Sequence, residues 1–197
     1  MLQFPKQLYL ASKSPRRAEL LTDIGLKFQL LSADIDESVI DHSNPVAFVK
    51  DISLQKAQAV IKMVTDGIII TADTIVYACE EILGKPKNES DAKRMLQILS
   101  DSEHAVYTGF TLSDAASGLS ETDHAVTYVR FKKLTDSEID EYIKTGSPLD
   151  KAGAYGIQDG MCALFIEEIR GCYYNVMGFP LNKFYTTSTK FIDELKK

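Results

Sequence analysis

Two adjacent arginines, Arg16 and Arg17, lie at the predicted start of a helix. Ser14, whose hydroxyl can cap, and Pro15 at the first helical position predict that start. Cations in the first turn are unfavourable because the backbone there already carries about half a positive charge. A phosphate would reverse this effect, and arginine holds phosphate through two parallel hydrogen bonds. The pattern indicates an anion site, although this stretch alone leaves open that both arginines face solvent.

Asp73 directly follows an apolar run over residues 67–72, which is typical of a central strand buried on both faces. A carboxylate at the end of a strand can bind a metal or orient a water for attack. The alternative is that Asp73 caps nearby backbone N–H groups. Lys56 lies on the apolar stripe of a predicted helix over 44–64, where an ammonium is costly unless paired or partly wet. It could extend to solvent, or meet an anion in a cleft.

Three further polar positions could take part in the same chemistry. Residues 34–37 hold three carboxylates, which form either a solvated acidic turn or, through Glu37, part of a divalent-metal site. Lys85 stands between a glycine and a proline, so its backbone is extended or in a turn and its cation is positioned. Gln158 ends a small-residue loop over 150–158 that would let the backbone approach a ligand. Its amide suits the edge of a nucleobase.

The elements that must position these side chains alternate irregularly between strand and helix patterns. Strands are predicted over 8–11, 27–33, 67–72, 75–78, 104–112 and 121–131, with a hairpin of 163–169 and 172–176; helices are predicted from 15 to 24 and over 44–64, 89–99, 135–145 and 181–195. Thr135 begins a capping-box pattern. Without strict alternation, the sheet is expected to be mixed, in an α/β fold.

Composition excludes several classes of protein. The 197 residues carry 22 Lys plus Arg and 28 Asp plus Glu, a net charge of −6, which argues against a general nucleic-acid binder. Any polyphosphate must therefore be neutralised locally by placed cations and a metal. No apolar run is long enough to span a membrane, and no signal-peptide pattern is present. Three cysteines without a Cys-x-x-Cys pair favour a reducing, cytoplasmic compartment and indicate neither disulfides nor zinc.

Familiar catalytic motifs are missing. The sequence contains no phosphate-loop motif, no dinucleotide-binding glycine fingerprint and no Gly-x-Ser-x-Gly elbow. The three histidines are isolated and lack metal-ligand spacing, so each is expected to be a surface or hydrogen-bonded residue. Serine nucleophiles and zinc chemistry are therefore not expected.

Six short stretches, in order along the chain, resemble the Maf family of nucleoside triphosphate pyrophosphatases, and the resemblance covers nearly the whole chain. They are Ser-Lys-Ser-Pro-Arg-Arg-Ala-Glu-Leu-Leu (12–21), Ala-Asp-Thr-Ile-Val (72–76), Leu-Gly-Lys-Pro (83–86), Tyr-Thr-Gly (107–109), Asp-Lys-Ala-Gly-Ala-Tyr-Gly-Ile-Gln (150–158) and Val-Met-Gly-Phe-Pro (176–180). Each stretch alone is a weak signal, and the six together are a strong one.

The resemblance implies a fold like that of the inosine triphosphate pyrophosphatases of the Maf/Ham1 type. In that fold one domain over 1–197 forms an elongated mixed sheet with flanking helices, in two lobes around a central cleft. It also implies hydrolysis of a nucleoside triphosphate to the monophosphate and pyrophosphate, with a divalent cation, Mg²⁺ or Mn²⁺. A homodimer is an open expectation, because family members often form dimers.

The resemblance also implies roles for individual residues. Asp73 matches the proton acceptor, and Arg16, Thr74 and Gln158 match specificity positions. The remaining polar positions of the family's pocket correspond to Ser12, Arg17, Glu37, Lys56 and Lys85, with the metal held by Glu37 or Asp73. The Arg, Thr and Gln set resembles the branch that acts on dTTP and UTP.

Two departures and two alternatives accompany this interpretation. Phe179 replaces a more usual leucine, a swap between core residue types, and residues 159–162 depart slightly from the family in length or composition, which could reshape the base end of the cleft. The first alternative is a pyrophosphatase for 7-methyl-GTP or other modified nucleotides. The second is a nucleotide-binding regulator of cell division or septum formation with weak or no catalysis.

Overall fold

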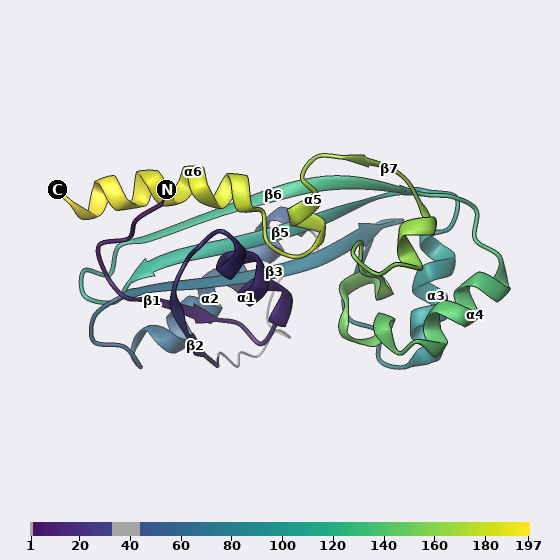
Figure 1. Ribbon diagram of the computed structural model, residues 1–197, viewed down its shortest axis with the longest axis horizontal. Helices are drawn as coiled ribbons and strands as arrows, with labels where there is room; N and C mark the ends of the chain where they lie inside the picture. The colour runs from purple at the N-terminus through teal and green to yellow at the C-terminus, as the bar shows by residue number, and fades with distance from the viewer. Residues whose placement is uncertain (1, 33–43) are drawn as a thin grey trace. The chain divides into compact units, whose positions relative to one another are not determined.

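The computed structural model describes residues 2–32 and 44–197 (Figure 1). Its strands are β1 (Leu8–Ala11), β2 (Phe28–Leu31), β3 (Ile68–Ala78), β4 (Glu81–Leu83), β5 (Glu103–Asp114), β6 (Ser120–Phe131) and β7 (Ile166–Arg170). Its α-helices are α1 (Pro15–Asp23), α2 (Pro45–Ile61), α3 (Glu89–Leu99), α4 (Asp136–Lys144), α5 (Tyr173–Val176) and α6 (Leu181–Leu195), with short 3-10 turns at Ser147–Asp150, Ala152–Ala154 and Cys162–Leu164. None of these helices has the length and apolarity needed to cross a membrane.

The strands form a mixed sheet, as the sequence predicts. Its order is β2-β1-β3-β5-β6-β7, with β4 paired to β3 off this path. β1 is parallel to both β2 and β3, whereas β4 is antiparallel to β3 and β7 is antiparallel to β6. The sheet therefore combines parallel pairing near the N-terminus with antiparallel pairing in the later strands.

The prediction that Asp73 and Thr74 separate two strands is wrong. Both residues lie inside β3, which continues through them as one 11-residue strand. β3 pairs with β1 through Ile68–Ile70 and with β4 through Val76–Ala78, so Asp73 and Thr74 fall between these two pairings. They are also two of the three half-buried residues in a strand that is otherwise buried. The polar pair interrupts the apolar pattern without ending the strand.

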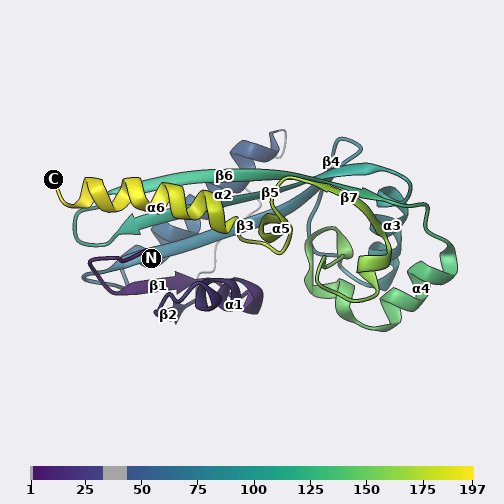
Figure 2. The same cartoon turned by 45° about the horizontal axis from the view of Figure 1, so that its top comes forward.

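The chain divides into two compact units that share the long strands β3, β5 and β6. The first unit contains Met1–Asp73, Thr108–Ala125 and Gly178–Lys197. Within it, α6 runs alongside β5 and β6 (Figures 1 and 2), and its inner face meets the sheet through aromatic packing. Phe184 of α6 lies 5.8 Å from Phe110 of β5 and 5.0 Å from Phe179, centroid to centroid. Phe179 is fully buried, which fits its interpretation as a core residue.

The second unit contains Thr74–Tyr107 and Val126–Met177. Helices α3 and α4 lie side by side in it (Figure 2), over a core rich in aromatic rings. Phe131 packs against Tyr155 at 4.9 Å and against Phe165 at 6.2 Å, and Tyr142 packs edge-on to Phe165 at 5.5 Å. The small-residue loop over 150–158 is therefore anchored in a hydrophobic core on one side.

The capping predictions have different outcomes. Thr135 forms the expected capping box with Glu138 at the start of α4. Ser14 is the N-cap residue of α1 and Pro15 its first residue, as predicted, but the Ser14 side chain makes no capping hydrogen bond. The backbone N–H of Ser14 donates to the hydroxyl of Ser12 at 3.2 Å, within the turn that follows β1.

The predicted hairpin of 163–169 and 172–176 is also wrong. Ile166–Arg170 is a strand, but it pairs with β6, and Tyr173–Val176 is the short helix α5. Gly171 has φ +135°, and a Cβ there would lie 2.8 Å from the Thr127 hydroxyl oxygen of β6. That same oxygen accepts the Cys172 N–H at 3.0 Å. The chain is thus tied to β6 by a side chain at the point where a second strand would have begun.

Candidate active site

Arg17 joins three parts of the first unit. Its Nε donates to the Gly178 carbonyl at 2.9 Å, and its Nη1 donates to the Ala72 carbonyl at 2.8 Å and to the Ser12 hydroxyl at 3.3 Å. The guanidinium thus connects the turn after β1, strand β3 one residue before Asp73, and the segment before α6. Arg17 and Ser12 therefore fix the backbone segments next to Asp73. The sequence pattern had not indicated this structural role.

The pKa of the Arg17 guanidinium responds to its surroundings. Burial lowers the pKa of its guanidinium, the negative charge of Asp73 raises it, and the positive charge of Arg16 lowers it. Arginine remains protonated in proteins because its ordinary pKa is very high. Asp73 of β3 and Arg16 of α1 therefore both lie close enough to act electrostatically on Arg17.

Asp73 and Lys56 form a close ion pair within the first unit. Lys56 Nζ donates to Asp73 Oδ1 at 2.7 Å, and each side chain is 16% exposed. Lys56 therefore meets an anion, as one of its alternatives stated, and that anion is a carboxylate of the protein. Among the residues that the structure describes, Oδ2 of Asp73 accepts no hydrogen bond. One oxygen of this carboxylate is thus held and the other remains able to act on a ligand.

Buried polar contacts hold α2, and with it Lys56, against the sheet. The Thr71 hydroxyl of β3 donates to the Ser53 carbonyl at 2.6 Å, and the Ser53 and Thr111 hydroxyls lie 3.0 Å apart. A Cβ at Gly109 of β5 would lie only 2.2 Å from the Val49 carbonyl oxygen, so only glycine allows this approach. The Tyr-Thr-Gly stretch was the signal for this contact, but the sequence could not identify its partner.

The second unit carries Thr74, Lys85 and Gln158. Thr74 is half-buried beside Asp73 in the chain, whereas Lys85 and Gln158 are exposed. The carbonyl of Gly84 accepts the Gly153 N–H at 3.0 Å, which joins the segment of Lys85 to the loop that ends at Gln158. Gly153 has φ +67°, and a Cβ there would lie 2.7 Å from a Val76 methyl group. A side chain at that position would clash with Val76 of β3, so the loop packs closely against that strand.

The predicted site residues thus separate into two sets. Ser12, Arg16, Arg17, Lys56 and Asp73 belong to the first unit, and Thr74, Lys85 and Gln158 belong to the second. The convergence of both sets on one pocket stays a prediction. Glu37, with the other carboxylates of 34–37, lies outside the described residues. Within residues 2–32 and 44–197, no group of three or more His, Cys, Asp and Glu side chains could hold a metal ion.

Two of the three histidines agree with their expected roles, and His42 lies outside the described residues. His104 is buried, and its Nε2 lies 2.8 Å from the Tyr155 hydroxyl. Burial lowers the pKa of His104 to about 4, so the ring is neutral at pH 7. His124 is half-buried next to Asp123. His104 therefore has a hydrogen-bonding neighbour in the core, and His124 lies beside a carboxylate.

Comparison with known proteins finds relatives of this chain along most of its length. A profile of the family described as "Maf-like protein" matches residues 7–191. The chain is 48% identical over 179 residues to a dTTP/UTP pyrophosphatase of Alkaliphilus metalliredigens, covering 90% of this chain and 92% of the relative. It is 47% identical over 181 residues to a dTTP/UTP pyrophosphatase of Clostridium perfringens, covering 91% and 94%. A dTTP/UTP pyrophosphatase of Desulforamulus reducens is 43% identical over 178 residues, with 90% and 93% covered.

A solved structure shares the fold. A HAM1 protein from Coxiella burnetii superposes with a TM-score of 0.56 at 13% sequence identity, covering 94% of this chain and 99% of that protein. At this identity the likeness shows the fold alone. It confirms the predicted mixed α/β fold of the Ham1 type.

Proposed function

The chain belongs to the Maf family, and from this premise we propose that it is a nucleoside triphosphate pyrophosphatase that hydrolyses dTTP and UTP to the monophosphate and pyrophosphate. The observation that carries this proposal is 43–48% identity, over about nine-tenths of the chain, to proteins named dTTP/UTP pyrophosphatase. The Lys56–Asp73 pair supports it with a carboxylate suited to base catalysis. We also propose a cytoplasmic location, which its three free cysteines favour.

Asp73 is proposed as the general base. With Oδ1 held by Lys56, the other carboxylate oxygen takes a proton from a water. The water oxygen then forms a bond to the α-phosphorus, and the bond from that phosphorus to the bridging oxygen breaks. Pyrophosphate leaves with the electron pair, and the nucleoside monophosphate is the other product.

Basic side chains are proposed to neutralise the triphosphate. Arg16 and Arg17 lie in the first turn of α1, where backbone N–H groups also favour an anion. Lys85 supplies a further exposed cation from the second unit, and Lys56 a half-buried one from α2. With a net charge of −6 on the whole chain, such local cations are required for polyphosphate binding.

The donor set fits a divalent cation of the Mg²⁺ or Mn²⁺ type. Asp73 offers carboxylate oxygen, the ligand that such ions prefer, and Mg²⁺ commonly takes one or two carboxylates together with substrate phosphate oxygens. We propose that Glu37 or Asp73 holds the ion; where Glu37 holds it, the second oxygen of Asp73 stays available as the base. When bound, the ion would stabilise charge that develops on the phosphate oxygens.

Arg16, Thr74 and Gln158 are proposed to select the nucleotide. Gln158 offers an amide donor and an amide acceptor on an exposed turn, which suits the Watson–Crick edge of a pyrimidine. Arg16 and Thr74 stand at the other specificity positions of the family. The three come from α1, β3 and the loop after α4.

The test is pyrophosphate release from a panel of nucleotides with Mg²⁺ or Mn²⁺ present. We expect dTTP and UTP to be hydrolysed faster than CTP, ATP, GTP and 7-methyl-GTP. A preference for 7-methyl-GTP or another modified nucleotide would replace the proposed substrate and leave the reaction unchanged. Binding of dTTP or UTP without any pyrophosphate release would overturn the enzyme proposal and favour a nucleotide-binding regulator.

A further inference from the structure

Gln158 lies on a tight turn of four residues in the second unit. The backbone N–H of Asp159 donates to the carbonyl of Gly156 at 2.9 Å, which closes the turn. Ile157 is only 5% exposed, whereas Gln158 is exposed. How well the position of Gln158 is fixed therefore depends on how firmly the two ends of this turn are held.

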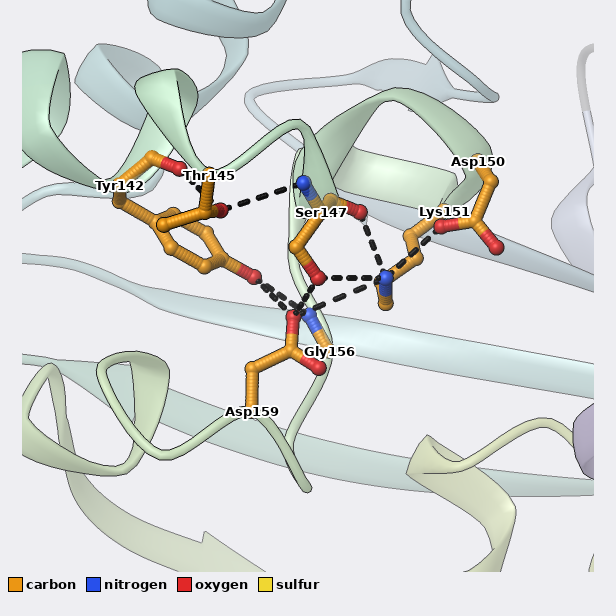
Figure 3. A network of polar contacts seen from close by, with 7 residues as sticks. All are labelled: Tyr142, Thr145, Ser147, Asp150, Lys151, Gly156 and Asp159. Carbon is orange, nitrogen blue, oxygen red and sulfur yellow. Dashed lines mark hydrogen bonds and ion pairs between the residues drawn. The ribbon is translucent and has the colours of Figure 1, made fainter.

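One hydroxyl group holds both ends (Figure 3). The Tyr142 hydroxyl accepts the Gly156 N–H at 3.1 Å and donates to Asp159 Oδ2 at 2.6 Å. Its ring is 1% exposed and packs edge-on to Phe165, so the hydroxyl cannot move freely. Burial and the bond to Asp159 raise the pKa of Tyr142, which keeps the phenol protonated as a donor.

Other contacts prevent the Asp159 carboxylate from turning away (Figure 3). The Ser147 hydroxyl donates to the same Oδ2 at 2.7 Å, and Lys151 Nζ lies 3.6 Å from it. Lys151 is itself fixed, because its ammonium donates to the Ser147 hydroxyl at 2.9 Å and to Asp150 at 2.7 Å. A Cβ at Gly156 would lie 2.6 Å from Lys151 Cε, so the cluster also packs closely against the turn.

We propose that Tyr142 is a positioning residue for nucleobase selection: its hydroxyl clamps both ends of the Gly156–Asp159 turn and thereby fixes where the Gln158 amide meets the base. This inference rests on the proposed function, since it assigns Gln158 to base recognition. Tyr142 acts through Gln158 and does not itself touch the substrate.

The chemistry of an amide explains why such a clamp matters. A carboxamide has both a donor and an acceptor, so a mobile glutamine could complement either uracil or cytosine. Discrimination requires the amide to be held where only one of the two bases fits. Because a displacement of about 1 Å can change a rate by about 10²-fold, modest loosening of the turn should reduce selectivity measurably.

The experiment measures the ratio of kcat/KM for UTP to that for CTP in wild type, Tyr142→Phe, Gln158→Ala and the double variant. Tyr142→Phe keeps the ring and removes only the clamping hydroxyl, and we expect it to lower the ratio about tenfold. In the Gln158→Ala background the same change should alter the ratio by less than about twofold, because the residue through which it acts is gone.

Tyr155→Phe is the matched control. Tyr155 is a buried tyrosine of the loop that ends at Gln158, and its hydroxyl lies 2.8 Å from His104 Nε2. We expect it to lose stability comparably to Tyr142→Phe while it keeps the UTP to CTP ratio. Equal falls in selectivity in both variants would reduce the role of Tyr142 to general stability and overturn the inference.

The remaining outcomes separate this inference from the proposed function. An active wild type whose selectivity survives Tyr142→Phe, or a double variant in which both losses add fully, would overturn the inference alone. A wild type that releases no pyrophosphate from dTTP or UTP would overturn the proposed function and the assignment of base selection with it. Hydrogen exchange at the Gly156 and Asp159 amides tests the clamp in either case, and unchanged exchange in Tyr142→Phe would overturn it.

Discussion

Each unit of the molecule holds a lysine beside an aspartate, but the two carboxylates have different partners. In the first unit, Asp73 accepts one hydrogen bond, from Lys56 at 2.7 Å, among the residues that the structure describes. In the second unit, Asp159 accepts from two hydroxyl groups on one oxygen and has Lys151 at 3.6 Å. The same two residue types therefore form one carboxylate bound by a lysine and one whose Oδ2 is bound by two hydroxyl groups beside a lysine.

This difference separates a reactive group from a positioning group. A general base needs an oxygen that can reach a water, and Asp73 retains one. Asp159 uses its Oδ2 to fix a turn, and removal of the two hydroxyl partners would leave buried polar groups unsatisfied. Burial alone does not distinguish the pairs, since the side chains of Asp73 and Asp159 are 16% and 18% exposed.

The largest expected effect comes from Asp73→Asn. Turnover of dTTP or UTP should fall at least ~10²-fold, because the variant cannot accept the water's proton. Nucleotide binding, measured by calorimetry, should persist. Asp159→Asn serves as the comparison and should lose less than about tenfold in turnover. Similar losses in the two variants would break the distinction between them, and normal turnover in Asp73→Asn would remove that residue from the base role.

The next effect tests how well the second unit excludes water. Burial lowers the pKa of His104 from 6.5 to about 4, so below pH 6.5 the unfolded chain binds a proton that the folded chain does not. The free energy of unfolding should therefore fall as pH decreases from 6.5 to 4, by about 3 kcal/mol from this residue. Urea denaturation of wild type and His104→Gln across this range isolates the contribution. Parallel pH profiles would show that water reaches the ring.

Replacing Lys56 or Lys151 by methionine should affect stability and turnover to different extents. Lys151→Met leaves the Ser147 carbonyl and neighbouring carboxylates without their cation, and we expect a loss of about 2 kcal/mol in stability. Lys56→Met should lose about 1 kcal/mol, because it removes one hydrogen bond to Asp73, whereas Lys151 donates to three groups. It should lose more turnover than Lys151→Met, because Asp73 is the proposed base. Chemical denaturation and pyrophosphate release measure the two quantities. A reversed order in either one would contradict the comparison.

The smallest effect concerns packing around Asp159. A Cβ at Gly156 would meet Lys151 Cε at 2.6 Å and Asp159 Oδ1 at 3.0 Å, so Gly156→Ala should destabilise the protein by about 1 kcal/mol. Gly160→Ala is the control, since a Cβ there has nothing within 4 Å, and its effect should stay within about 0.5 kcal/mol. Equal stability of the two alanine variants in thermal unfolding would show that the cluster has room to adjust.

Elements with strong local signals could be predicted from the sequence. The predicted bounds of α3 and α6 agree with the structure at Glu89–Leu99 and Leu181–Leu195, because helical periodicity and capping act within a few residues. The continuity of β3 through Asp73 and the pairing of β7 with β6 could not be predicted. Both depend on partners supplied by distant strands. Within the local sequence, the polar pair Asp73–Thr74 indicates the end of a strand and Gly171 indicates a hairpin turn.

The candidate site shows the same limit. Residue types identified Asp73, Lys56 and Gln158 as chemically competent, and the resemblance to the Maf family is confirmed by the comparisons. The contact of Gly109 with α2 and the clamp formed by Tyr142 had no local signal that named their partners. Each joins segments from separate elements of the fold.

The sequence by itself determined the family, most of the helices and strands, and the set of side chains able to do phosphate chemistry. Only the tertiary structure decided that Lys56 is paired with Asp73 while Lys151 is enclosed in a hydrogen-bonded cluster with Asp159. The physical reason is that local propensity sets the elements, whereas the partners of a charged side chain depend on which elements pack together and on how much water they leave around it.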